Sequence, residues 1–217
     1  MLVRCVSLLL FLFPVVSFTQ SIHTVPIGKE DDLLPALLSV RTGDQSTVLA
    51  LLKDHKRHVT RRLCDALVQA ASMSSNLGDS ARSLFLYQVA KEAAKQLEDK
   101  KLLAFIYYKT GRAHFEQDHI ERATEEYLQS KKLFEEANSP RDIVYILSQL
   151  GTLHIYAADY KKAKEYSEES LALARTLNNS SDPAGAMPDE YGIAFAWSNL
   201  GVLRQARRCN RDRVQRG

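Results

Sequence analysis

The sequence predicts an all-α fold, a solenoid of antiparallel helix pairs stacked along the chain. Three observations predict it: glycines with similar neighbours recur at intervals of 40 and 50 residues, the second lengthened by about ten inserted residues; apolar residues within each unit follow the three-and-four spacing of an α-helix; and strand-like alternation is lacking. The 217 residues are 45% hydrophobic and 25% charged, which suits one folded array with an apolar core.

Gly111, Gly151 and Gly201 mark the repeat. Each has a large side chain four residues before it, and the first two have an alanine, Ala123 or Ala163, twelve residues after them. A small residue on the inner face of a first helix, facing an alanine on the second helix, lets the two helices approach closely. We therefore expect two antiparallel helices in each unit, with glycine and alanine at their contact.

The register extends back to Ala71, forty residues before Gly111, so four units are expected, the first of them degenerate. The predicted helices of the array are 61–77, 79–98, 100–117, 119–137, 140–157, 159–178 and 189–206, with a surface loop at 178–188. A weaker pair, 30–41 and 46–58, precedes them. The predicted organisation is a signal peptide 1–21, an N-terminal helical cap 30–58, an array 61–206 with units 64–98, 104–138, 144–178 and a partial unit 194–206, and a disordered basic tail 207–217.

Capping residues support these helix boundaries. Asp79, Asp118 and Asp159 stand where second helices should begin, and an Asp side chain there can accept hydrogen bonds from the free backbone N–H groups of the first turn. Ser139 and Pro140 open a first helix, with proline where its missing N–H does no harm.

The first 21 residues resemble a secretory signal peptide. Arg4 is the one charge before an apolar run at 6–16, and small residues follow the run. It is too short to span a bilayer, which requires about 20 apolar residues. Cleavage is expected near residues 19–21, which predicts an exported bacterial protein, periplasmic or secreted, with no stable membrane span. The alternatives are an uncleaved anchor or a buried first helix.

The charge distribution argues against a nucleic-acid partner. The formal net charge is +3, but the tail 204–217 carries +5 and Arg4 another +1, so the rest of the chain is mildly acidic. Binding along a nucleic-acid backbone requires a basic stripe on the folded surface. The tail arginines could attract RNA or an anionic surface, but no aromatic residue is interleaved with them, and an unstructured leftover is the favoured interpretation.

The units resemble the tetratricopeptide repeat (TPR), in the variety that carries Leu-x-x-Leu-Gly in its first helix, as at Leu147, Leu150 and Gly151. The resemblance covers about residues 64–204 and implies a right-handed superhelix that binds peptides. Unit length, signal peptide and Leu-Gly motif also resemble the N-terminal TPR region of bacterial proteins that end in a caspase-like CHAT domain. The pattern departs at the end, where Arg213 takes the alanine position; this predicts a truncated or out-of-frame continuation of a longer gene.

We expect no catalytic residue, no metal and no cofactor. His114 and His154 hold equivalent positions, three residues after their glycines, and are expected to pack inside the helix pairs. Two histidines without a carboxylate or cysteine at ligand spacing do not make a zinc site. Cys64 lies in no motif that would activate a thiol, and it too is expected to pack. Phosphate-binding loops, HExxH and Ser-centred elbows are lacking.

Helical geometry predicts a concave groove lined by residues six, three and two before each glycine, and one, four and five after it. The wider lining is Phe105, Tyr108, Lys109, Arg112, Phe115, Glu116, Tyr145, Ser148, Gln149, Thr152 and Tyr156, flanked by Gln69 and Asn199. From it we expect peptide binding by Phe105, Tyr108, Lys109, Arg112, Tyr145, Gln149, Thr152 and Asn199. Tyr107, Thr110 and His114 take the packed side, while Phe115 and Tyr156 either line the groove or pack between repeats.

The sequence thus predicts a non-enzymatic scaffold that holds a protein or peptide. An alternative from the enzyme class is the sensor region of a larger caspase-like peptidase or signalling enzyme, whose catalytic domain is absent from this chain. A third hypothesis is a nucleic-acid or anionic-surface binder that acts through the tail.

Overall fold

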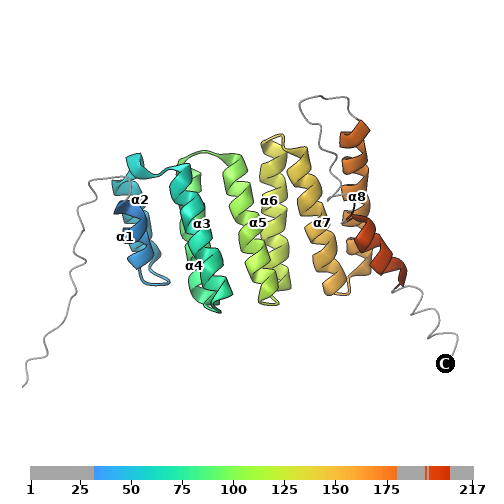
Figure 1. The fold of residues 1–217 in the computed structure, drawn as a ribbon, viewed down its shortest axis with the longest axis horizontal. Coiled ribbons are helices and arrows are strands. Elements are labelled where there is room, and N and C mark those ends of the chain that lie inside the picture. Colours follow the sequence, from blue (N-terminus) through green and yellow to red (C-terminus); the bar gives the residue numbers. More distant parts are fainter. Residues whose placement is uncertain (1–31, 180–193, 195, 206–217) are drawn as a thin grey trace, which may run out of the picture.

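The computed structural model describes residues 32–179, 194 and 196–205, and this part of the chain is helical without strands (Figure 1). The helices are α1 (Leu33–Ser39), α2 (Gln45–Asp54), a 3₁₀ turn η2 (Lys56–His58), α3 (Arg61–Asn76), α4 (Ser80–Gln96), α5 (Lys100–Glu116), α6 (Ile120–Glu136), α7 (Pro140–Tyr156) and α8 (Tyr160–Asn179). Residues 196–205 form a further helical segment. The predicted all-α fold is confirmed. None of these helices is long and apolar enough to cross a membrane.

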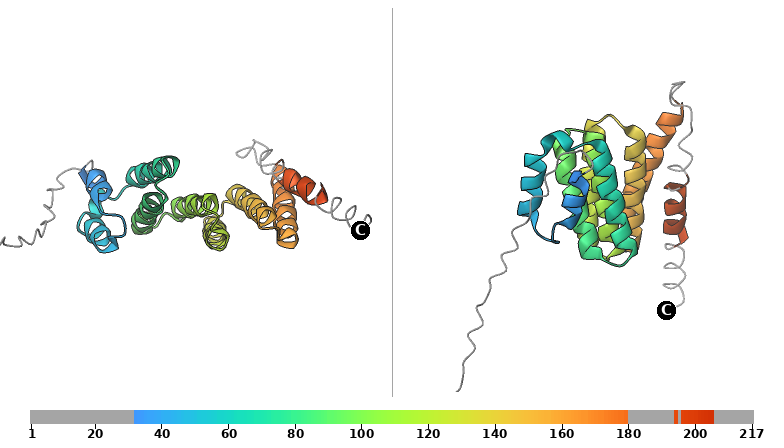
Figure 2. Two further views of the ribbon diagram at one scale, coloured as in Figure 1. Left: turned by 90° about the horizontal axis from the view of Figure 1, so that it is seen from below. Right: turned by 60° about the vertical axis from the view of Figure 1, so that its left-hand side comes forward.

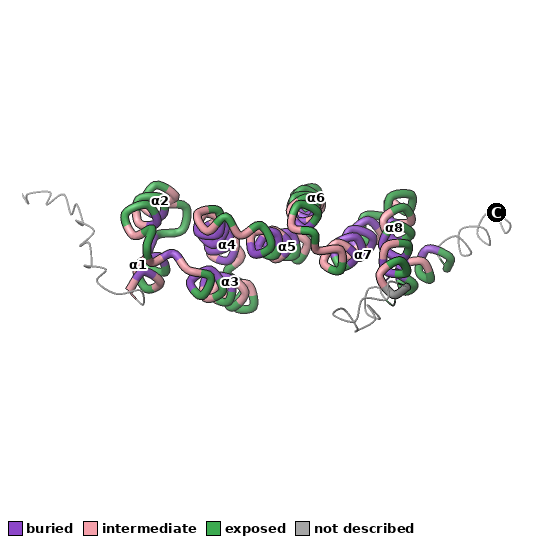
Figure 3. Tube along the Cα trace, turned by 90° about the horizontal axis from the view of Figure 1, so that it is seen from above, coloured by how far each residue is buried: buried purple, intermediate pink, exposed green. Residues whose placement is uncertain are grey.

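The helices pack as consecutive antiparallel pairs. The most extensive contacts join α3 with α4, α5 with α6, and α7 with α8, and the pairs touch one another through α4 with α5 and α6 with α7. The array is elongated, with α1 and α2 at one end and α8 near the other (Figures 1 and 2). In the pairs α1/α2, α3/α4 and α5/α6 the first helix lies on one side of the array and its partner on the other (Figure 3). Side-chain contacts of Tyr108 with Tyr145 and of Phe115 with Tyr156 join α7 to α5. The first helices therefore share one face.

The turns between helices repeat every twenty residues. A residue with positive φ follows each helix from α3 to α7: Gly78, Glu98, Asp118, Asn138 and Ala158. After α5, the N–H of His119 donates to the carbonyl of His114 and the N–H of Asp118 to that of Phe115, at 2.9 and 3.0 Å. This is the Schellman arrangement, which satisfies the last carbonyls of a helix through one left-handed residue. Helices of similar length joined by similar turns produce the regular stack.

The turn geometry corrects one predicted cap. Asp79 and Asp159 accept hydrogen bonds from the N–H groups of Arg82 and Lys162, so these two predictions are confirmed. Asp118 was expected to do the same, but its φ is 61° and the residue that precedes α6 is His119, whose side chain makes no capping bond. Asp118 fills the left-handed turn position instead, which Asp tolerates better than most residues.

The predicted close contacts of Gly111 and Gly151 with the second helices of their pairs are confirmed. A Cβ added to Gly111 would lie 3.2 Å from the carbonyl oxygen of Ala123, and one added to Gly151 would lie 3.5 Å from that of Ala163. A Cβ at Gly201 meets nothing within 4 Å in the described part of the chain. The first two glycines therefore let their helix pairs approach closely, whereas Gly201, in the predicted partial unit, has no such neighbour among the described residues.

The N-terminal pair shares the apolar core of α3 and α4, and one arginine adds hydrogen bonds to it. Arg82 of α4 donates hydrogen bonds to the backbone carbonyls of Leu38 and Val40, the latter at 2.7 Å. The predicted helix 46–58 ends at Asp54, and the turn η2 leads from it into α3. The predicted signal peptide, most of the loop 178–188 and the tail 207–217 lie outside the described residues.

Candidate functional site

The face formed by α3, α5 and α7, here called the first-helix face, carries most of the predicted binding residues. Phe105 and Tyr145 are 39% and 36% exposed, Arg112 is exposed, and Lys109, Gln149 and Thr152 are half-buried. Tyr108 and Asn199 are only 6% and 5% exposed. The eight predicted residues therefore divide into six that reach the surface and two that lie beneath it.

Tyr108 lies under the surface and supports its aromatic neighbours. Its hydroxyl is 2.9 Å from the hydroxyl of Tyr145, and the two rings meet edge to face with centroids 5.3 Å apart. Its ring also stacks on Tyr127 of α6, at 6.0 Å. Burial, together with the hydrogen bond to Tyr145, raises the pKa of Tyr108. Tyr108 thus joins α5, α6 and α7 and fixes the position of Tyr145, which is itself partly open to solvent.

Asn199 fastens the last helical segment to α7. Its amide nitrogen donates to the carbonyl of Ser148 at 3.1 Å, and its amide oxygen accepts from the hydroxyl of Thr152 at 3.2 Å. Ser148, also predicted in the groove lining, is fully buried and its hydroxyl lies 2.9 Å from that of Ser170. Asn199 and Ser148 therefore use their polar groups within the protein.

The cations of α5 differ in their pairing. Arg112 forms a salt bridge with Glu116, with 2.9 Å between Nε and Oε1. Lys109 has no carboxylate of the described residues within ion-pair distance, and its ammonium lies 5.2 and 5.6 Å from the ring centroids of Phe105 and Tyr108. Burial lowers the pKa of Lys109, and the charge of Arg112 lowers it further. Glu116 acts on Lys109 in the opposite direction but lies beyond ion-pair distance, so Lys109 is a cation held by aromatic faces without a direct salt bridge.

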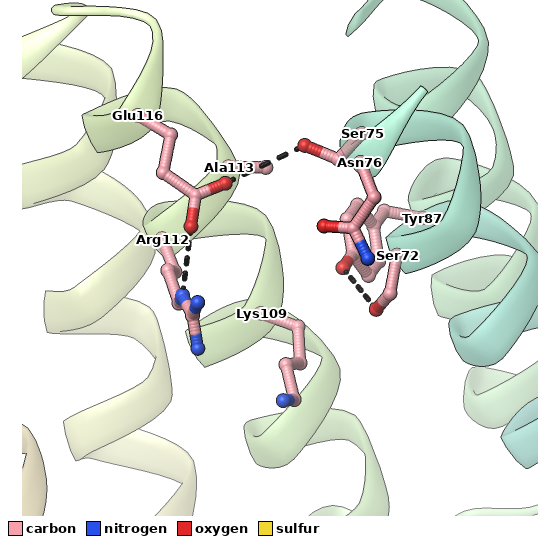
Figure 4. Close-up of a pocket in the computed structure, with 8 residues that line it drawn as sticks. All are labelled: Ser72, Ser75, Asn76, Tyr87, Lys109, Arg112, Ala113 and Glu116. Atoms are coloured by element: carbon pink, nitrogen blue, oxygen red, sulfur yellow. Dashed lines mark hydrogen bonds and ion pairs between the residues drawn. The ribbon is translucent and has the colours of Figure 1, made fainter. Parts of the chain in front are cut away.

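A polar hollow opens between α3 and α5, next to Lys109 (Figure 4). Its volume is about 180 Å³, and this α3/α5 hollow is lined by Ser72, Ser75, Asn76, Tyr87, Lys109, Arg112, Ala113 and Glu116. The hydroxyls of Ser72 and Tyr87 are 2.9 Å apart, and the hydroxyl of Ser75 donates to Glu116 at 3.4 Å. Side chains of two neighbouring repeats thus meet around one cavity.

Sequence reasoning missed the α3 side of the hollow. Its three residues, Ser72, Ser75 and Asn76, lie one, four and five residues after the repeat alanine at position 71. Two of these offsets, one and five, also place Arg112 and Glu116 after the glycine of the next unit. The signal was present, because the degenerate first unit follows the same register with alanine in place of glycine.

Two other predicted positions pack against each other. The rings of Phe115 in α5 and Tyr156 in α7 meet edge to face at 5.3 Å, so they pack between neighbouring repeats, one of the two expected outcomes. Tyr156 is still 64% exposed and extends the aromatic surface of the first-helix face. On the packed side, Thr110 and His114 are buried as expected, and Tyr107 is half-buried below the ammonium of Lys91.

The titratable groups of the core are inert. Burial lowers the pKa of His114 to about 4, and burial also lowers that of His154. Burial raises the pKa of the Cys64 thiol to about 12, which keeps it protonated and unreactive at neutral pH. No group of three His, Cys, Asp or Glu residues that could hold a metal ion occurs within the described ranges.

No family model and no curated protein matches this sequence. Two solved structures resemble its fold. BtubC (BKLC) from P. vanneervenii superposes with a TM-score of 0.51 at 16% identity, over 86% of this chain and 87% of that chain. A variant of a putative kinesin light chain from Podospora anserina, with nearly identical TPR-like repeats, gives 0.51 at 14% identity, over 88% of this chain and 90% of that chain. The fold is therefore a TPR-like helical repeat, as the sequence resemblance implied.

Proposed function

We propose that this chain is a non-enzymatic scaffold that binds a protein segment on its first-helix face. The observation that carries the proposal is the coincidence of exposed aromatic rings and unused polar groups on that face. Phe105 and Tyr145 supply apolar area, while Lys109 and Gln149 make no hydrogen bond to the described residues. Aromatic anchors beside free donors are typical of surfaces that bind peptides.

The register of these residues fits an extended ligand. Phe105 and Tyr145 both lie six residues before the glycine of their repeat, and Lys109 and Gln149 both lie two before it. Consecutive repeats therefore carry an aromatic side chain six residues before the glycine and a polar side chain two residues before it. A segment that runs across α5 and α7 would meet this pair of features twice. The hydrogen bond of Tyr145 to Tyr108 holds its ring in place beforehand, which lowers the entropy lost on binding.

The likeness to a putative kinesin light chain and to BtubC supports a scaffold role at the level of fold. The alternative, a sensor region of a larger caspase-like enzyme, stays a prediction about additional domains encoded by the gene. In that case the first-helix face would still bind a protein segment, so both hypotheses use the same surface.

Selection from a random dodecapeptide library tests the proposal. Peptides that bind the chain should lose affinity for the double variant Phe105→Ser, Tyr145→Ser. The control is Leu128→Ser, because Leu128 is 40% exposed and belongs to α6, a second helix, rather than to α3, α5 or α7. Peptides bound equally by both variants, or bound less by the Leu128 variant alone, would contradict the assignment.

We also propose that the chain is exported. The apolar run after Arg4 and the small residues near 17–21 support this proposal, because they resemble a secretory signal peptide and its cleavage site. N-terminal sequencing of the protein from a bacterial host's periplasm or medium should begin near residue 20 or 22. A mature protein that begins at Met1 would overturn this proposal. We do not propose a nucleic-acid partner, because the chain before residue 204 is mildly acidic.

A further inference from the structure

Residues 53–62, which lead from α2 through η2 into α3, form a basic turn. The segment contains five cations and one acid, so its formal charge is +4, whereas the whole chain carries only +3. We propose that this basic turn binds the anionic phospholipid headgroups of a bilayer and holds the array against a membrane surface. Its five cations are all exposed: Lys53, Lys56, Arg57, Arg61 and Arg62.

Four of these five cations have no carboxylate partner. Arg61 forms a salt bridge with Asp99, the residue that caps α5, with 2.8 Å between Nη1 and Oδ2. For the other four, no carboxylate of the described residues lies within ion-pair distance. The one acid of the segment, Asp54, is itself exposed and pairs with none of them. Like charges gathered in this way repel one another, and an anionic surface would relieve the repulsion.

Cations further along the same edge of the array are paired. The connections from α2 to α3 and from α4 to α5 both lie along one long edge, at the top of Figure 1. At the beginning of α5, Lys100 Nζ lies 2.9 Å from Oε2 of Glu136, and Lys101 Nζ lies 3.2 Å from Oδ2 of Asp142. The edge therefore carries unpaired positive charge at the basic turn and paired charge at the beginning of α5.

The backbone of the basic turn is held in a fixed shape. The N–H of His58 donates to the carbonyl of His55 at 2.8 Å, and the N–H of Val59 to that of Lys56 at 3.2 Å. The two imidazole rings stack with their centroids 6.2 Å apart, and Val59 is buried in the apolar core that α3 and α4 share. Lys56 and Arg57 therefore project from an ordered turn, which lowers the entropy lost on binding.

An exposed leucine beside the cations favours a bilayer over a nucleic acid. Leu49 is 47% exposed and lies four residues before Lys53, on the same face of α2. Surfaces that lie on membranes combine basic side chains with apolar ones that enter the boundary between headgroups and acyl chains. A nucleic-acid backbone gains nothing from a leucine and requires a longer stripe of cations, but the next cations along this edge are already paired.

The test is partition of the full chain onto unilamellar vesicles. One set contains phosphatidylcholine and phosphatidylglycerol in equal parts, the other phosphatidylcholine alone, and sedimentation separates bound from free protein. The ratio of the two partition coefficients reports the preference for anionic lipid. It also removes any contribution of the apolar run at 6–16 that does not depend on lipid charge. We expect wild type to prefer the anionic vesicles, and to lose this preference at about 1 M salt, where charges are screened beyond about 3 Å. No preference for anionic vesicles would overturn the proposal.

A double variant of the turn is compared with a matched double variant of the same edge. Lys56→Gln with Arg57→Gln should lower the ratio roughly 30-fold, because each cation near an anionic leaflet contributes about 1 kcal/mol. The control, Lys100→Gln with Lys101→Gln, removes the same formal charge from paired lysines and should change the ratio by less than about twofold. The tail 204–217 is identical in both variants, so its charge cancels. Equal losses in the two variants would overturn the proposal, because net charge alone would then account for binding.

Leu49→Ser distinguishes a bilayer from other polyanions. It should lower the partition coefficient on the anionic vesicles roughly 3- to 10-fold, about half the effect of burying a whole leucine side chain. Leu128→Ser on α6, which is 40% exposed, should leave that coefficient unchanged. A DNA duplex or polyglutamate, at the same concentration of anionic groups as the vesicles, should displace little of the bound chain. An unaltered Leu49→Ser variant, or displacement of most of the chain by either polymer, would overturn the choice of a lipid surface.

The basic turn and the proposed peptide-binding residues are different sets of side chains, so their tests are independent. The turn variants should bind a selected dodecapeptide as wild type does, and the variant Phe105→Ser, Tyr145→Ser should keep its preference for anionic vesicles. Loss of vesicle binding in the Phe105 and Tyr145 variant, with the basic turn intact, would place the lipid contact on the first-helix face and overturn the role of the turn.

Discussion

A Cβ atom added to Gly111 would lie 2.7 Å from Cδ1 of Tyr127, closer than real Cβ atoms come to such neighbours. Tyr127 is 1% exposed and stacks on Tyr108, so its ring has no free space to move into. The absent side chain at Gly111 thus lets Tyr127 fill the contact between α5 and α6. The same tyrosine supports Tyr108 and, through it, the exposed ring of Tyr145.

We expect Gly111→Ala to destabilise the array relative to Gly201→Ala. Alanine favours a helix over glycine by about 1 kcal/mol at both positions, so the comparison cancels this gain. What remains is the overpacking against Tyr127, about 1–3 kcal/mol. Urea denaturation followed by circular dichroism measures both variants. Equal stabilities would show that Tyr127 can move aside without cost.

The left-handed turn after α7 offers a stabilising change. Ala158 has a φ of 57°, a conformation that costs an L-residue with a Cβ about 1 kcal/mol. Ala158→Gly should therefore raise the free energy of unfolding by up to that amount, seen as a higher urea midpoint. The neighbouring Ala157 has a φ of −72°, so Ala157→Gly is the control and should stabilise nothing. A gain in both variants, or in neither, would refute the strain at Ala158.

The ion pair between α4 and α6 should respond unequally to the loss of each partner. Lys91 Nζ lies 2.7 and 2.6 Å from the two carboxylate oxygens of Glu126, and the side chains are 6% and 19% exposed. Burial lowers the pKa of Lys91 in spite of the attraction of Glu126. Glu126→Gln leaves a buried ammonium without its partner and should cost about 3 kcal/mol.

Lys91→Met should cost less, because methionine fills much of the same volume without a charge and the side chain of Glu126, which is 19% exposed, can reach solvent. Urea melts at neutral pH give both values, since urea does not screen charges. A larger loss for Lys91→Met than for Glu126→Gln would contradict this account.

His114 should make the protein less stable in mild acid. Burial, and next the charges of Arg122 and His119, lower its pKa to about 4 from the ordinary value of 6.5. Between these pH values the unfolded chain binds the proton and the folded chain does not, so stability falls as the pH is lowered from 6.5 to 4. His114→Phe should flatten this fall, although His154, whose pKa is also lowered, contributes a second part.

Thermal melts across a pH range from about 7 to about 4 measure the effect. His55→Gln, a substitution in the turn between α2 and η2, serves as the control and should keep the wild-type profile. A His114→Phe profile parallel to that of wild type would contradict the burial argument.

Much of the fold was predictable because the repeat is local. The spacing of Gly111 and Gly151 with Ala123 and Ala163 is a direct consequence of helix-pair contact, so it could be recognised in one sequence. The conformation of the turns was harder to predict from the sequence. Asp is a residue type that often caps helices, but Asp118 follows the twenty-residue period of the turns and takes the left-handed position. Only the backbone hydrogen bonds of the turn distinguish these two roles.

For the proposed binding face, the sequence predicted which helix positions contribute to it but not how deeply each side chain is buried. Helical periodicity places Tyr108 and Asn199 toward the first-helix face, but it contains no information on which side chains a neighbouring repeat covers. Tyr145 and Tyr127 cover Tyr108. The amide of Asn199 donates a hydrogen bond to the carbonyl of Ser148. The pairing state of Lys109 likewise depends on where Glu116 points, which is a matter of side-chain packing rather than of sequence.

The most direct test of the central claim maps where a selected dodecapeptide binds. Backbone ¹H–¹⁵N spectra of the 24.5 kDa chain, recorded during titration with the peptide, report every amide at once. We predict that the largest shifts fall on α3, α5 and α7, around Ser75, Lys109 and Gln149, while the outer residues of α4, α6 and α8 stay unchanged. Shifts confined to those second helices would contradict the claim that the first-helix face is the binding surface.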